Sequence, residues 1–106
     1  MKRINILLVC SAGMSTSLLV EKMKKIAQEK EIDAEIWAIG SSYLDTELNT
    51  RDVDVILVGP QMRYELTKIQ ERAIQSQIKA EAIDMQDYGL CRAENVLNQA
   101  LDLINH

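Results

Sequence analysis

Short apolar runs alternate with longer amphipathic segments along most of this chain. The apolar runs have the length of buried strands and lie at residues 4–9, 34–39, 53–58 and 78–83. In the longer segments, apolar residues recur at intervals of three and four; these segments lie at residues 16–30, 61–75 and from residue 93 onward. The pattern predicts four strands separated by helices, while residues 43–49 fit either a short helix or an irregular connection.

This alternation of strands and helices predicts an α/β fold with a parallel sheet, because right-handed crossovers place each helix against a face of the sheet. For four strands we expect an open sheet in the order 2-1-3-4 with helices on both faces. Ligands of such sheets bind beyond the carboxyl ends of the strands, where the strand order reverses. That point lies between the first and third strands. Residues 10–17 and 59–63 should face each other there, with the turn after Ile83 nearby.

Length, composition and charge narrow the class of protein. The 106 residues are expected to form a single domain, 1–106, with an aliphatic core, because the chain has one Trp, three Tyr and no Phe. A net charge of −4, without a stripe of Lys and Arg between aromatic residues, makes a nucleic-acid partner unexpected. No apolar stretch approaches the roughly 20 residues that cross a bilayer. We therefore expect a cytoplasmic protein that is not inserted in the membrane.

Cys10 comes directly after the first predicted strand and begins a loop of mostly small residues. The loop continues with Ser11, Ala12, Gly13, Met14, Ser15, Thr16 and Ser17. Backbone N–H groups of such a loop can surround an anion, and the start of the next helix adds unpaired donors. The loop would then hold a phosphoryl group beside a thiolate nucleophile. A small buried Cys followed by an ordinary capped turn fits the same residues, and the residues alone leave both interpretations open.

This loop lacks the marks of the common nucleotide-binding and phosphatase loops. No Gly-Lys-Ser/Thr follows it, and Gly13 stands alone, so neither familiar nucleotide loop is indicated. Tyrosine phosphatases carry Cys-x5-Arg at the same strand-to-helix junction, but the sixth residue after Cys10 is Thr16. The guanidinium that would hold the transition state is missing. The loop is therefore suited to carrying a phosphoryl group on sulfur and poorly suited to hydrolysing it.

Three segments carry a resemblance to a known family. They are LLVCSAGMSTS at residues 7–17, LVGPQMRY at residues 57–64, and Ile83-Asp84 followed by Tyr88-Gly89. Over essentially its whole length the chain resembles the IIB component of the lactose/cellobiose (chitobiose) family. These components belong to the bacterial phosphoenolpyruvate-dependent sugar phosphotransferase system (PTS). The first segment is the most specific of the three.

The resemblance implies a phosphotransferase that works through a phosphocysteine. Cys10 would accept a phosphoryl group from a phosphohistidine on a IIA component. It would then pass the group to a sugar bound by the membrane-embedded IIC component, and the backbone amides of residues 11–17 would hold the phosphoryl oxygens. No cofactor or metal is implied, because phosphoryl transfer relies mainly on positioning and electrostatic stabilisation. A cellobiose-type β-glucoside or disaccharide is expected, although the sequence leaves the particular sugar open.

Other residues near the predicted switch point are candidates for the rim of the pocket. They are Pro60, Gln61, Tyr64, Asp84 and Tyr88. Pro60 also fits an ordinary helix start, and Asp84 also fits a helix cap. Neither Cys91, which no anion-binding loop precedes, nor the terminal His106 is expected to carry phosphate.

Two other functions remain as alternatives. One is a hydrolase like the low-molecular-weight tyrosine phosphatases or arsenate reductases, against which Thr16 in place of Arg argues. The other is a IIB-like regulatory module that reports sugar flux to a transcription factor. Such modules usually belong to longer chains, so a single domain argues against this alternative.

Overall fold

The computed structural model describes residues 3–10 and 14–105. Its strands are β1 (Ile4–Cys10), β2 (Ala34–Gly40), β3 (Val55–Val58) and β4 (Lys79–Ala82). Its α-helices are α1 (Met14–Glu29), α2 (Leu44–Thr50), α3 (Leu66–Gln75), α4 (Met85–Gly89) and α5 (Ala93–Asn105). Two 3-10 helices, η1 (Ser41–Tyr43) and η2 (Pro60–Glu65), precede α2 and α3. Strands and helices therefore alternate as the sequence pattern predicts.

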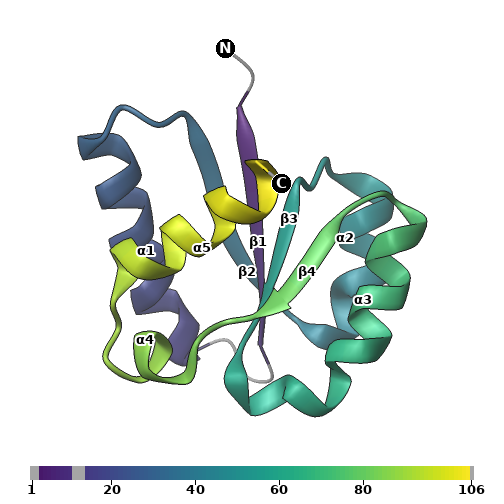
Figure 1. The fold of residues 1–106 in the computed structure, drawn as a ribbon. Coiled ribbons are helices and arrows are strands. Elements are labelled where there is room, and N and C mark those ends of the chain that lie inside the picture. Colours follow the sequence, from purple (N-terminus) through teal and green to yellow (C-terminus); the bar gives the residue numbers. More distant parts are fainter. Residues whose placement is uncertain (1–2, 11–13, 106) are drawn as a thin grey trace.

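The four strands form one parallel sheet in the order β2-β1-β3-β4, which confirms the predicted fold class and strand order. All the strands therefore point their carboxyl ends to the same edge. That edge lies at the bottom of Figure 1, where the start of α1, the short helix α4 and the segment between β3 and α3 come together. The strand order reverses between β1 and β3, and β1 ends there with Cys10.

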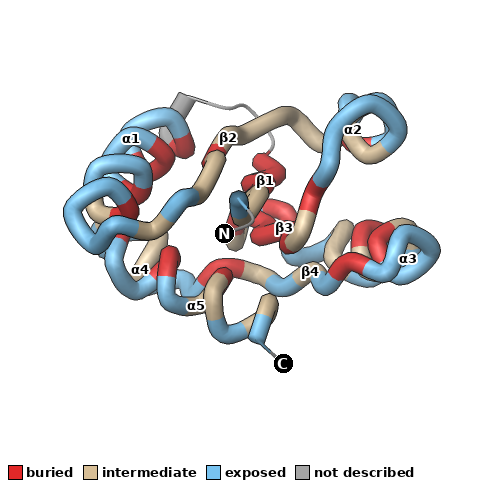
Figure 2. The backbone as a smooth tube through the Cα atoms, turned by 90° about the horizontal axis from the view of Figure 1, so that it is seen from above, coloured by how far each residue is buried: buried red, intermediate tan, exposed pale blue. Residues whose placement is uncertain are grey.

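Side chains alternate along β1 between two apolar layers, one on each face of the sheet. Ile6 and Leu8 pack with α1 and α5, whereas Leu7 and Val9 pack with α2 and α3. All four are fully buried, so the central strand is apolar on both faces, as expected for a parallel sheet. Figure 2 shows the buried stretches on the helix sides that face the sheet and exposed stretches on the outer sides.

The main differences from the predicted elements lie at element ends. The predicted helix over 61–75 is wrong in its first part, since a 3-10 segment precedes the α-helix there. Pro60 offers no N–H, the amide of Met62 bonds to the carbonyl of Gly59 at 2.9 Å, and Met62 has non-helical dihedrals. Strand β3 begins at Val55, two residues later than predicted, and β4 is shorter than predicted by one residue at each end.

Two segments that the sequence pattern left open are helical. Residues 43–49 fall at the end of η1 and in α2, so the short-helix alternative is confirmed there. Helix α4 was not predicted as an element of its own, because five residues are too few for an apolar period to show. Within residues 3–10 and 14–105, no helix is long and apolar enough to cross a membrane.

Candidate functional site

Cys10 lies at the carboxyl end of the central strand, between the ends of its two neighbours. Its partner in the register with β2 is Gly40, and on the other side the amide of Gly59 donates to the carbonyl of Val9 at 2.9 Å. The Cys10 side chain is 3% exposed, and its thiol donates to the carbonyl of Ile39 at 3.6 Å. The nucleophile candidate is therefore held at the switch point of the sheet, where ligands of open α/β folds bind.

Glycines stand beside Cys10 on both sides, Gly40 at the end of β2 and Gly59 directly after β3. A Cβ atom added at Gly59 would lie 3.9 Å from the Cβ of Cys10 and only 3.0 Å from Oε1 of Gln61. At Gly40, an added Cβ would meet its nearest neighbours at 3.8 and 3.9 Å, which is ordinary contact. Gly40 was not predicted as part of the site. The predicted strand order 2-1-3-4 could have indicated it, because that order makes the end of the second strand a neighbour of Cys10.

Of the predicted phosphate-binding residues 11–17, those from Met14 onward lie in α1. The predicted phosphate-binding residues Ser11, Ala12 and Gly13 lie outside the described residues. Met14, Ser15, Thr16 and Ser17 form the first turn of α1, which starts two residues earlier than predicted. The N-terminal end of a helix carries a partial positive charge, so the start of α1 is a location that favours an anion.

Thr16 links that first turn to the far side of the site. Its side chain is 1% exposed, and its Oγ1 lies 3.2 Å from the hydroxyl oxygen of Tyr88 in α4. The structure thus brings together two predicted site residues that are 72 positions apart. The position where a phosphatase would carry its Arg is occupied by a buried hydroxyl with a tyrosine partner.

The segment after β3 forms the opposite rim. Pro60 is the first residue of η2, which fits the helix-start interpretation of this proline. The Gln61 side chain is exposed and turns back so that its Oε1 lies against Gly59, beside Cys10. Tyr64, in contrast, is 78% exposed, so this predicted rim residue lies on the outer surface of the protein.

Asp84 follows β4 and acts as the cap of α4. Its Oδ1 accepts hydrogen bonds from the backbone amides of Gln86 and Asp87, each at 3.0 Å. This is the capping arrangement that the sequence analysis gave as one interpretation of Asp84. Cys91 lies in the turn between α4 and α5, half-buried and with a φ of 52°.

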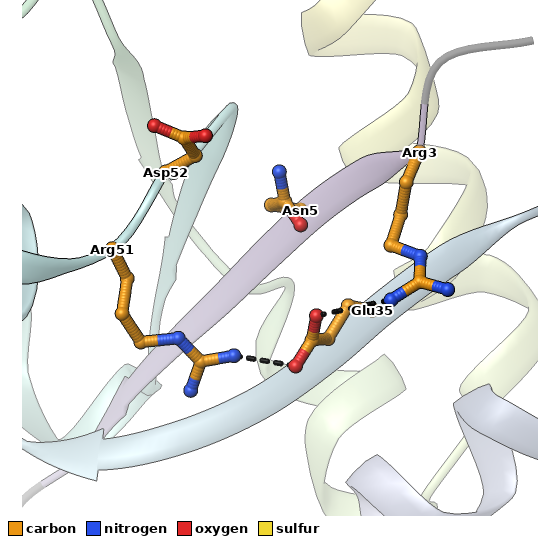
Figure 3. A pocket seen from close by; sticks show the side chains of 5 residues that line it. All are labelled: Arg3, Asn5, Glu35, Arg51 and Asp52. Atoms are coloured by element: carbon orange, nitrogen blue, oxygen red, sulfur yellow. Dashed lines mark hydrogen bonds and ion pairs between the residues drawn. The ribbon is translucent and has the colours of Figure 1, made fainter.

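A charged hollow of about 460 Å³ lies at the other edge of the sheet, where the strands begin. Figure 3 shows Glu35 between Arg3 and Arg51, with which it forms ion pairs. Arg51 also stacks on the ring of Trp37, with its guanidinium carbon 4.0 Å from the ring centre. Both arginines of this hollow are therefore paired with the same carboxylate, Glu35.

Comparison with known proteins assigns the chain to a family. The family model described as "PTS system, Lactose/Cellobiose specific IIB subunit" matches residues 5–99. The chain belongs to this IIB family. Members of the family are PTS components, so the chain is a IIB component of a PTS, and IIB components are phosphotransferases.

Curated relatives agree with the family match over nearly the whole chain. An oligo-beta-mannoside-specific EIIB component of Bacillus subtilis is 46% identical over 99 residues, which are 93% of this chain and 94% of the relative. A galactose-specific EIIB component of Lactococcus lactis subsp. cremoris is 41% identical over 103 residues, 94% of this chain and 95% of the relative. A cellobiose-specific EIIB component of Lactococcus lactis subsp. lactis is 40% identical with the same coverage.

Solved IIB structures share the fold. The cellobiose-specific IIB component of Borrelia burgdorferi superposes with a TM-score of 0.80 at 39% identity, over 98% of this chain and 94% of that one. The lactose-specific IIB domain of Streptococcus pneumoniae gives a TM-score of 0.81 at 18% identity, over 96% and 98%, and supports the fold alone. The predicted family and the sheet architecture are both confirmed.

Proposed function

We propose that Cys10 is the phosphoryl carrier of this IIB component. The observation that supports this most is the place of Cys10 in a IIB fold. It is the last residue of the central strand, lies at the switch point between Gly40 and Gly59, and precedes the loop that leads into α1. A thiol there lies where ligands of open α/β sheets bind and next to the start of a helix, which favours an anion.

In the proposed reaction, the phosphoryl group moves twice in line. The Cys10 thiolate attacks the phosphorus of a phosphohistidine on a IIA component; the N–P bond breaks and an S–P bond forms. A hydroxyl oxygen of the sugar in the IIC component then attacks the same phosphorus. The S–P bond breaks, the thiolate returns, and the sugar proton passes to a base of IIC. The amides of residues 11–17 would hold the oxygens that carry the charge.

The surface around the site supports docking of protein partners. Large apolar side chains are exposed at this edge of the sheet: Leu18 in the first turns of α1, Tyr64 in η2, Met85 at the start of α4 and Leu90 after it. They come from three different segments at the carboxyl edge of the sheet. Exposed apolar side chains grouped in this way are typical of protein contact surfaces. The same face would serve IIA and IIC in turn, because Cys10 must meet both.

The specificities of the relatives support a proposal for the sugar that finally accepts the phosphoryl group. Relatives specific for oligo-beta-mannoside, galactose and cellobiose are similar to this chain at 40–46% identity. We propose a cellobiose-type β-linked disaccharide as the final acceptor, with selection made by IIC. The exchange would take place in the cytoplasm, where a carrier thiol remains reduced.

The test compares the two cysteines. The protein is incubated with phosphoenolpyruvate, enzyme I, HPr and a cognate IIA component, and intact mass spectra are recorded for wild type, Cys10→Ser and Cys91→Ser. One added phosphoryl group is expected on wild type and on Cys91→Ser, and none on Cys10→Ser. Cys91→Ser is the matched control because it removes the other free thiol. An adduct that survives in Cys10→Ser would refute the assignment.

A further inference from the structure

The contact between the hydroxyls of Thr16 and Tyr88 joins the start of α1 to helix α4. Thr16 is the third residue of α1, and Tyr88 lies in α4, which follows the last strand. Their oxygens are 3.2 Å apart, and the Thr16 side chain is 1% exposed. Water therefore has little access to the Thr16 hydroxyl, and Tyr88 provides it with a partner inside the protein.

Helix α4 is fixed firmly enough to serve as an anchor. Its first turn is capped by Asp84, and the amide of Tyr88 donates to the carbonyl of Asp84 at 2.9 Å. Just before it, the amide of Ile83 donates to the carbonyl of Val58 at 2.8 Å, which ties the segment to the end of β3. The Tyr88 ring also packs against the core layer formed by α1, α5 and the sheet. Little freedom is left to the tyrosine hydroxyl.

We propose that Tyr88 is a positioning residue for phosphoryl transfer by Cys10. Its hydroxyl holds Thr16, and Thr16 holds the first turn of α1, whose amides border the phosphoryl group. This inference rests on the proposed function of Cys10. It gives Thr16 a different role from the phosphate-binding hydroxyl considered in the sequence analysis, because that hydroxyl is directed to Tyr88.

The physical reason is the sensitivity of the reaction to the placement of its donors. Phosphoryl transfer depends on donors that are already in place when charge develops, and small displacements lower the rate strongly. Without the tyrosine hydroxyl, the buried oxygen of Thr16 loses this partner and the turn must shift to find another. The substitution would thus displace the backbone donors of the first turn of α1, although it removes no group that contacts the phosphoryl group.

The experiment is a double-substitution cycle on the transfer rate. Single-turnover phosphorylation by phosphorylated IIA is measured for wild type, Tyr88→Phe, Thr16→Val and the double variant, over a range of IIA concentrations. Each single substitution should lower the saturating rate by about fivefold, the size of one lost hydrogen bond, and the double variant should be no slower than the singles. The IIA concentration at half-saturation should stay the same, since the docking surface is intact.

Two controls separate positioning from general loss of structure. Thr16→Ser keeps the hydroxyl and should retain most of the wild-type rate, whereas Thr16→Val should not. Thr46→Val removes an exposed hydroxyl at the same position of another helix, α2, and should leave the rate unchanged. Unfolding by urea, measured for every variant, shows that the compared proteins are folded under the assay conditions.

The outcomes distinguish this inference from the proposed function. A phosphorylated wild type whose saturating rate is unchanged in Tyr88→Phe would overturn the positioning role alone. Strictly multiplicative effects of the two substitutions would also overturn it, because they would show that the hydroxyls act independently. A wild type that accepts no phosphoryl group from IIA would overturn the proposed function, and this inference with it.

Discussion

At the scale of single residues, the site is defined by small neighbours as much as by its nucleophile. Cys10 lies between Gly40 and Gly59, and the carboxamide oxygen of Gln61 approaches Gly59 so closely that a side chain there would touch it. The backbone at Gly59 has a φ of −58°, which any residue adopts. A larger residue at this position is therefore limited by the Gln61 side chain and not by backbone conformation.

Because space and not backbone conformation limits position 59, we predict that Gly59→Ala slows phosphorylation of Cys10 without unfolding the protein. The new Cβ would displace the exposed Gln61 side chain and narrow the space beside Cys10. Phosphorylation should slow by about tenfold, as expected for misplaced groups at a reacting centre, while the free energy of unfolding changes by less than about 1 kcal/mol. Stopped mass-spectrometric time courses and urea titrations measure the two effects.

Gly40→Ala serves as the matched variant, because its new Cβ would make only ordinary contacts at 3.8 and 3.9 Å. It should keep most of the wild-type rate. Equal slowing in both variants would show that any Cβ next to the central strand disturbs the site. The particular contact between Gly59 and Gln61 would then have no special importance.

At the scale of elements, helix α1 both packs on the sheet and presents an exposed apolar side chain, and two neighbouring residues serve these different purposes. Leu19 is 1% exposed and belongs to the core layer beneath the sheet, whereas Leu18 is 58% exposed near the site. One face of the helix therefore fixes its position on the sheet, and the next residue is available to a partner. The position of the helix also determines where the amides of its first turn lie.

Alanine substitutions of these two leucines should separate folding from docking. Leu19→Ala leaves a cavity in the core and should lower the free energy of unfolding by about 2–5 kcal/mol. Leu18→Ala should change it by no more than about 0.5 kcal/mol, but raise the IIA concentration for half-maximal phosphorylation by roughly fivefold. Urea unfolding and phosphorylation at varied IIA concentrations give both quantities. An unchanged concentration dependence in Leu18→Ala would remove this residue from the docking surface.

At the scale of the whole molecule, the two edges of the sheet differ in the side chains that they carry. The carboxyl edge holds Cys10, the start of α1 and exposed apolar side chains, while at the opposite edge Arg3 and Arg51 both form ion pairs with Glu35. The edge strand β4 is held from both faces, because Gln70 of α3 and Gln99 of α5 donate to its carbonyls at Ala80 and Ala82. Such pairing leaves the carboxyl edge as the face suited to transient partners.

Much of this arrangement could be predicted from the sequence. Apolar runs and amphipathic periods determine the strand order, since four strands joined by right-handed crossovers have one economical arrangement, and that order places Cys10 at the switch point. Individual side-chain contacts between distant segments could not be predicted, because no local pattern encodes them. The bond between Thr16 and Tyr88 depends on the path of α4, and the close approach of Gln61 to Gly59 depends on the 3-10 turn after β3.

Discharge of the phosphorylated protein tests most directly whether Cys10 is a carrier and not a hydrolytic nucleophile. Phosphorylated wild type, freed of its donors, is incubated in buffer, with sugar alone, with vesicles containing the IIC component, and with vesicles and cellobiose together. We predict that the phosphoryl group leaves Cys10 rapidly only in the last mixture, and that one sugar phosphate is formed for each group lost. Release of inorganic phosphate at the same rate in buffer alone would contradict it.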